Sequence, residues 1–183
     1  CRRFNIKKVY QIKKKVKAKL MVDATASIGL ENCHNLADVV FFSSCKGLFG
    51  PTGLGFVAHK KKINKIKSKD FWYDYQTHEE SKYTLAYNCL APLEKISSRH
   101  KIFKGRLMYA RNFMKKYSFN YNNCPNIGIS LKYKINKRNI NNNMLLYQPR
   151  KKPGYDTIFF LGMIKFSKPA IKKVLKSNII NKL

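Results

Sequence analysis

The segment "DVVFFSS", residues 38–44, restricts the fold more than any other, because it is a near-continuous apolar run with polar residues only at its ends. A run of this kind is typical of a strand that is buried on both faces of a mostly parallel sheet. A shorter run, "KLMVDA" at 19–24, precedes it, and "GLGFVAHK" at 53–60 follows it after a turn rich in Gly and Pro. The three runs predict neighbouring strands of an α/β domain.

The rest of the chain predicts a smaller unit attached to a long helix. From Pro92 onward, apolar side chains recur at spacings of three, four or seven, and proline suits the first turn of a helix, so we expect one amphipathic helix over about 92–116. His100 falls on its apolar face, which favours a packed histidine over a ligand. Strands are predicted at 126–133, 144–150 and 157–164, and a closing helix at 168–180. The predicted domains are 1–91, a connecting helix 92–117, and a small α+β domain 118–183.

The charge balance is strongly basic, with 38 Lys and Arg against 9 Asp and Glu and a formal net charge of +29. Such a balance is typical of proteins that bind nucleic acids. Here the lysines are scattered over many short runs instead of lining one element, which favours compositional drift in an AT-biased coding sequence. A basic nucleic-acid-binding module remains the alternative from a different functional class.

The cysteines and the apolar runs bear on the cellular compartment. Five cysteines form no CxxC pair and no Cys/His spacing suited to zinc, so we expect neither a metal site nor a disulfide framework, and a reducing cytoplasm. The longest uncharged apolar stretch falls far short of the roughly 20 residues that a membrane span needs, which predicts a soluble protein. The sequence begins at Cys1, and we expect it to be part of a longer chain.

Two polar residues occupy the positions where an α/β sheet places its ligands. Asp23 ends the first predicted strand, and Lys46 follows the second. Ligand sites in open α/β sheets lie outside the carboxyl ends of the strands, so both side chains are expected to project into one crevice. Taken alone, an acid and a lysine placed in this way more often form a salt bridge or are solvated.

The residues around this pair resemble a known family. "VDATASIG" followed by "ADVVFFSSCKGLFGPTGLGFVA" is similar to the class V aminotransferases, which are fold-type I enzymes dependent on pyridoxal 5'-phosphate. They carry an Asp, a Ser and Gly shortly after it, a Ser-rich turn, the cofactor lysine, and a stretch rich in Gly and Pro. "KYTLAYNCLAPLEKI" resembles the later segment that leads into their long helix. The resemblance implies part of a fold-type I large domain, with a mostly parallel sheet, plus the small C-terminal α+β domain.

The resemblance also implies roles for individual residues. Lys46 would bind the cofactor aldehyde and then act as general base, and Asp23 would pair with the pyridine nitrogen and keep it protonated. Thr84 matches the position that reaches the phosphate of the neighbouring subunit, which implies a homodimer. Cofactor contacts are implied for Lys46, Asp23, Thr25, Ser43, Ser44 and Thr84.

The substrate-binding part of the family pattern is less complete. The strand that usually supplies an arginine for the substrate carboxylate has Phe160 at the aligned position, and Arg150 in "YQPRKKPGY" is the substitute that the sequence offers. We expect an aminotransferase that moves an amino group from a small amine or amino acid to an oxo acid such as pyruvate.

The branch of the family stays open between three alternatives. "VDATASIG" is nearest the 2-aminoethylphosphonate–pyruvate aminotransferases, while "KGLFGPTGLGFVA" is close to the alanine/serine–glyoxylate enzymes. A cysteine desulfurase is expected to have a histidine immediately before the lysine, where this chain has Cys45.

Overall fold

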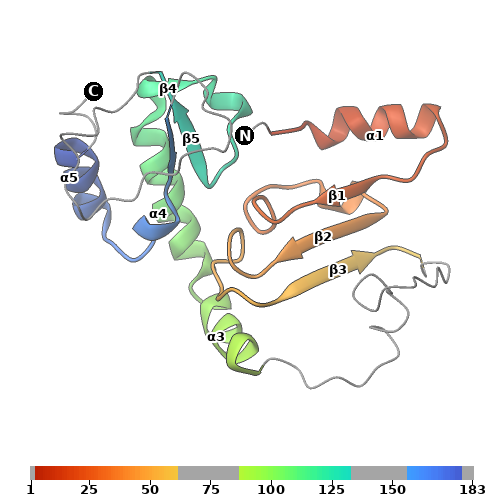
Figure 1. The fold of residues 1–183 in the computed structure, drawn as a ribbon, viewed down its shortest axis with the longest axis horizontal. Helices are drawn as coiled ribbons and strands as arrows, with labels where there is room; N and C mark the ends of the chain where they lie inside the picture. The colour runs from red at the N-terminus through yellow and green to blue at the C-terminus, as the bar shows by residue number, and fades with distance from the viewer. Residues whose placement is uncertain (1–2, 62–86, 133–155, 179–183) are drawn as a thin grey trace.

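The computed structural model describes residues 3–61, 87–132 and 156–178, and these form a mixed α/β structure with two three-stranded sheets (Figure 1). One sheet lies in the N-terminal lobe, residues 3–61, and the other lies in the C-terminal lobe, which follows α3 (Tyr87–Ser97) and α4 (His100–Phe113) in the chain (Figure 1). These two successive helices connect the lobes (Figure 1). Within these ranges, none of the helices has both the length and the apolar character needed to cross a membrane.

The first sheet contains the three strands that the apolar runs predict. Its order is β1 (Met21–Asp23), β2 (Val39–Ser43) and β3 (Gly55–His59). β1 pairs with β2 in parallel, whereas β3 pairs with β2 antiparallel, so the described sheet is mixed instead of mostly parallel. The prediction that β2 is buried on both faces holds for its first two residues only, because Phe41 is 37% exposed.

Helix α1 (Ile6–Lys15) packs against this sheet through Ile6, Val9 and Tyr10, and its other residues are polar or basic except for the exposed Ile12. A carboxylate at the start of β2 connects the two elements: Asp38 accepts the Leu20 N–H at 2.7 Å and forms an ion pair with Lys13 at 2.9 Å. The Leu20 N–H, followed by the Lys13 ammonium, lowers the pKa of Asp38. Asp38 therefore has a structural function, as its position at the start of a strand suggests.

The connecting helix is two helices, so the prediction of one helix over 92–116 is wrong. α3 (Tyr87–Ser97) contains Pro92 in its interior, and α4 (His100–Phe113) begins after a short break. Ser97 Oγ donates to the carbonyl of Glu94 at 2.6 Å, and Ser98 Oγ donates to that of Lys95 at 3.0 Å. Serine side chains that bond to nearby carbonyls compete with the helical pattern, and both of these bonds lie at the end of α3.

The second sheet is antiparallel throughout and packs with α4 and α5 (Lys168–Asn178). It consists of β4 (Ser118–Phe119), which the apolar pattern does not predict, β5 (Gly128–Leu131) and β6 (Thr157–Phe159). The predicted strand at 157–164 is too long, because the chain turns into a 3₁₀ helix at Leu161–Met163. The predicted strand at 144–150 lies outside the described residues.

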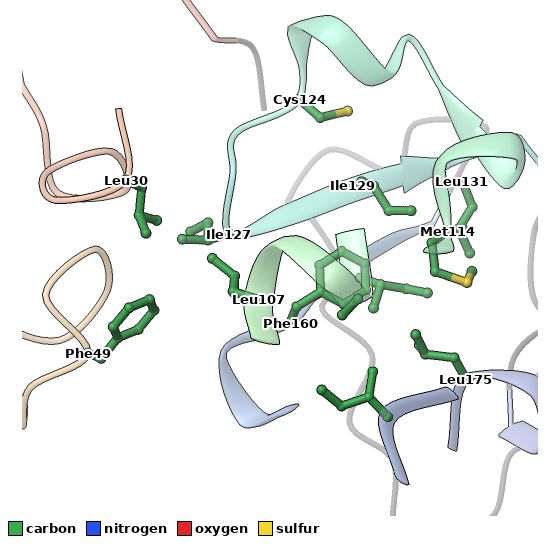
Figure 2. Close-up of a cluster of buried hydrophobic side chains, with 13 residues drawn as sticks. Leu30, Phe49, Leu107, Met114, Cys124, Ile127, Ile129, Leu131, Phe160 and Leu175 are labelled. Carbon is green, nitrogen blue, oxygen red and sulfur yellow. The ribbon is translucent and has the colours of Figure 1, made fainter. Parts of the chain in front are cut away.

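The largest hydrophobic core fills the C-terminal lobe (Figure 2). Phe160, Leu107 and Ile129 lie in it and are at most 1% exposed. Leu30 and Phe49, from loops of the N-terminal lobe, belong to the same cluster (Figure 2). The core therefore reaches the loops that follow β1 and β2, and Phe49 stands only three residues after Lys46.

Candidate functional site

The structure brings Asp23 and Lys46 to one edge of the first sheet. Asp23 is the last residue of β1, and Lys46 lies in the turn immediately after β2. Because β1 and β2 are parallel neighbours, their carboxyl ends meet at the same edge. Both side chains are exposed, and no ion pair joins them. The two groups are therefore adjacent in the fold and accessible to a ligand.

The Asp23 carboxylate is held in its charged form by Thr25. The Thr25 backbone N–H donates to Asp23 Oδ1 at 2.9 Å, and this bond is the main reason why the pKa of Asp23 lies below its ordinary value. A second bond from the Thr25 side chain acts in the same direction, burial opposes both, and the positive charge of Lys46 lowers the pKa further. Asp23 is consequently an anion throughout the neutral pH range.

The turn that carries Lys46 is closed by its own backbone hydrogen bonds. The Gly50 N–H donates to the Ser44 carbonyl at 2.8 Å, and the Phe49 N–H donates to the Lys46 carbonyl at 3.1 Å. The Lys46 amine projects from this turn, and among the described residues it has no hydrogen-bond or ion-pair partner. The turn thus presents at the sheet edge an amine that has no partner in the described part of the chain.

Phe49 shows that this turn is under conformational constraint. Its φ is +60°, in the left-handed region that bulky side chains rarely adopt, and such a conformation costs roughly 1–3 kcal/mol. Its ring is only 7% exposed and lies between His100, with ring centroids 5.0 Å apart, and Phe103, at 6.0 Å. Burial of the ring offsets the backbone strain, and the helices thereby fix the turn.

Gly47 is a point of close contact between the loop after β1 and the Lys46 turn. Its N–H donates to the Thr25 carbonyl at 3.1 Å, which joins the Lys46 turn to the residue that holds Asp23. A Cβ atom at position 47 would lie 2.2 Å from the Ile28 carbonyl oxygen. Only glycine fits this contact without moving the backbone.

We expect the substitution Gly47→Ala to destabilise the protein by about 1–3 kcal/mol, the usual cost of forcing extra atoms into a packed site. Urea unfolding followed by circular dichroism measures this change. Gly55→Ala is the matched control, because a Cβ there meets no atom within 4 Å. Equal unfolding midpoints for the two variants would contradict the close contact at Gly47.

The two serines at the end of β2 differ in availability. Ser44 is completely buried, and its hydroxyl donates to the Pro51 carbonyl, so its proton is already used within the turn. Ser43 is half-buried, with Oγ 3.3 Å from Cys45 Sγ. Ser43 is therefore the better donor for an anion at this edge. Thr84 and Arg150 lie outside the described residues.

A Ser–His pair in the loop after β1 has no counterpart in the sequence-based analysis. Ser27 Oγ lies 2.8 Å from His34 Nε2. Burial lowers the pKa of His34, and Glu31 partly opposes this effect. The two residues are seven positions apart with no recognisable motif, so only the folded loop reveals the pair.

The lowered pKa of His34 predicts a loss of stability at mildly acidic pH. The pKa of a histidine in an unfolded chain is about 6.5, so below that pH the unfolded chain binds the proton more readily than the folded one. The stabilisation is complete above this value and is lost as the pH falls below it, whereas Asp23 and Asp38 titrate at lower pH. We expect thermal unfolding midpoints to fall between about pH 7 and 5, and to fall less in His34→Gln. An identical pH dependence in both proteins would refute this origin.

A cleft of about 570 Å³ borders the site on the Asp23 side. Its walls are mostly apolar and include Val9 of α1, Val22 of β1 and Pro125, and both Asp23 and Ser27 lie at its surface. Lys46 does not line this cleft. This cleft therefore does not enclose Asp23 and Lys46 together.

Metal-ligating side chains are dispersed in the part of the chain that the structure describes. Within the described ranges, His, Cys, Asp and Glu side chains form no group of three or more that could hold a metal ion. The four cysteines that the structure describes, Cys33, Cys45, Cys89 and Cys124, are free thiols.

A comparison with models of known protein families gives no match for this chain, and no curated protein matches it significantly.

Proposed function

We propose that this chain binds pyridoxal 5'-phosphate at the Asp23 and Lys46 edge and acts as an aminotransferase of the class V, fold-type I kind. One observation carries the proposal: parallel strands β1 and β2 bring a carboxylate and an amine to the same sheet edge, and neither is paired with the other. A structural salt bridge would have paired the two groups, and they are not paired.

The chemistry of the available groups fits the cofactor. The Lys46 amine is free to bind the aldehyde carbon, and the Asp23 carboxylate stays charged, as a partner of a protonated pyridine nitrogen must. The Ser43 hydroxyl lies at the end of β2, where it would hold the phosphate. When bound, the cofactor supplies an electron sink for a carbanion at the substrate Cα.

A residue of this chain would transfer the proton of the substrate Cα. The Lys46 amine would carry the Cα proton as general base. A lysine amine accepts a proton at neutral pH only when its surroundings favour the uncharged form. Lys46 is exposed, and a bound cofactor would exclude water from it.

The substrates and the assembly belong to the same proposal. The amino donor is a small amine or amino acid, of which 2-aminoethylphosphonate is the first to test, and the acceptor is an oxo acid such as pyruvate. Arg150 is the proposed partner of the substrate carboxylate, and Thr84 would reach the cofactor phosphate across a homodimer. The completely buried Phe160 offers no contact to a substrate, so the acid must be recognised elsewhere.

Chemical mapping tests the proposal directly. The purified chain is mixed with pyridoxal 5'-phosphate, reduced with borohydride, digested, and analysed by mass spectrometry. We expect the reduced cofactor on Lys46, although Lys and Arg total 38 and most lysines are exposed. Label spread evenly over surface lysines would contradict the proposal. Alanine formation from pyruvate and 2-aminoethylphosphonate then tests the donor and acceptor.

A further inference from the structure

We propose that two residues of α4, His100 and Lys104, are positioning residues that hold the Lys46 turn against the loop following Asp23. We call this pair the α4 clamp. The inference rests on the proposed function, because it assigns the clamp the task of setting where the Lys46 amine stands relative to the Asp23 carboxylate.

Each clamp residue binds one of the two loops. His100 Nε2 lies 3.0 Å from the Gly47 carbonyl oxygen, and a carbonyl can only accept, so the ring nitrogen is the donor. Lys104 Nζ donates to the Gly29 carbonyl at 3.0 Å. Residues four apart are neighbours on a helix surface, so one face of α4 captures a carbonyl from both loops.

The imidazole of His100 is fixed by packing as well as by its hydrogen bond. Its ring contacts the strained residue Phe49, with centroids 5.0 Å apart. On the other side, a Cβ at Gly29 would lie 2.8 Å from His100 Nε2, and Gly29 has a φ of +71°. The loop after β1 therefore approaches the ring closely at a residue that has no side chain.

The clamp is connected to both proposed cofactor-binding groups through the backbone. Gly47 directly follows Lys46, its carbonyl binds His100, and its N–H binds the Thr25 carbonyl. Thr25 in turn holds the Asp23 carboxylate. A loss of the His100 bond would leave the carbonyl of buried Gly47 without this donor and free the turn to shift. Supporting contacts of this kind decide whether a site keeps its productive geometry.

The variants His100→Phe, His100→Gln and Lys104→Met test the clamp in the full chain. Phenylalanine keeps an aromatic ring but has no donor, whereas glutamine keeps an N–H donor. We expect His100→Phe to weaken the binding of pyridoxal 5'-phosphate about tenfold, His100→Gln to recover most of that loss, and Lys104→Met to weaken binding about threefold. Lys101→Met is the matched control, because Lys101 is an exposed lysine of the same helix outside the clamp.

Hydrogen exchange of the cofactor-free protein separates the clamp from the proposed function. The Gly47 and Phe49 amides, both hydrogen-bonded in the turn, should exchange faster in His100→Phe and at the wild-type rate in His100→Gln. Faster exchange without cofactor binding in the wild type would refute the function and keep the clamp. Wild-type exchange and affinity in a folded His100→Phe variant would overturn the clamp, even if Lys46 binds the cofactor.

Discussion

The substitution Phe160→Ala is expected to lower the free energy of unfolding by about 3–5 kcal/mol, the usual cost of removing a fully buried aromatic ring. The side chain is 0% exposed, and it lies in the core between α4, α5 and the second sheet (Figure 2). Phe160 also joins two elements, because its N–H donates to the Ile127 carbonyl at 2.9 Å. Urea unfolding followed by circular dichroism measures the loss.

Two further substitutions make this prediction specific. Phe166→Ala is the matched control, since Phe166 is 48% exposed and its truncation should change stability by less than about 0.5–1 kcal/mol. Phe160→Leu keeps most of the buried volume and should cost less than Phe160→Ala. Similar unfolding midpoints for Phe160→Ala and Phe166→Ala would mean that Phe160 is not part of the core.

The burial of Phe160 also bears on the proposed substrate site. An arginine at this position would place an unpaired charge among apolar side chains, which is among the most destabilising changes in a folded protein. Phe160→Arg is therefore not a way to restore the arginine of the class V pattern. In this chain the aligned position has a packing function.

The sequence predicts the positions of the strands of the first sheet well, though not its mixed pairing, because these strands are short apolar runs bounded by polar residues or glycine. Those runs depend on local periodicity, which needs no knowledge of distant contacts. The turn between them is predicted for a similar reason, since Gly47 and Gly53 mark backbone that side chains would obstruct or strain.

The apolar pattern does not predict the ends of helices and strands where a continuous helix and a broken one would bury the same side chains. The apolar face of 92–116 continues across the break between α3 and α4: Leu93, Ile96, His100 and Phe103 all remain on the side that packs against the loops or the core. The signal for the break comes from Ser97 and Ser98, whose hydrogen bonds leave no trace in hydrophobicity. The run at 157–164 likewise stays apolar after its strand has ended.

The candidate site also contains residues that the sequence predicts and residues that it does not. Asp23 and Lys46 follow from the general position of ligand sites at strand ends, so the sequence alone places them together. The His100 bond to Gly47 joins residues 53 positions apart and exists only because α4 packs across the turn. The proposed cofactor-binding residues can therefore be predicted from local sequence. The residues that hold them in place cannot, because their contacts depend on tertiary packing.

Lys46→Met is expected to abolish covalent retention of pyridoxal 5'-phosphate, because it removes the only proposed amine at the sheet edge. The measurement is the amount of reduced cofactor that survives denaturation, together with its position by mass spectrometry. Lys172→Met is the matched control, since Lys172 is an exposed lysine of α5 in the other lobe and its loss should leave labelling of Lys46 unchanged.

Lys46→Arg separates the charge of this side chain from its nucleophilicity. Arginine keeps a positive charge beside Asp23, so the low pKa of that carboxyl and the stability of the fold should persist. Its guanidinium stays protonated, so it can neither bind an aldehyde nor accept the Cα proton. A stable Lys46→Arg protein without covalent cofactor or alanine formation would identify the amine as the reactive group. Undiminished labelling in that variant would show that the cofactor reacts at another lysine and that Lys46 is only a solvated residue of the turn.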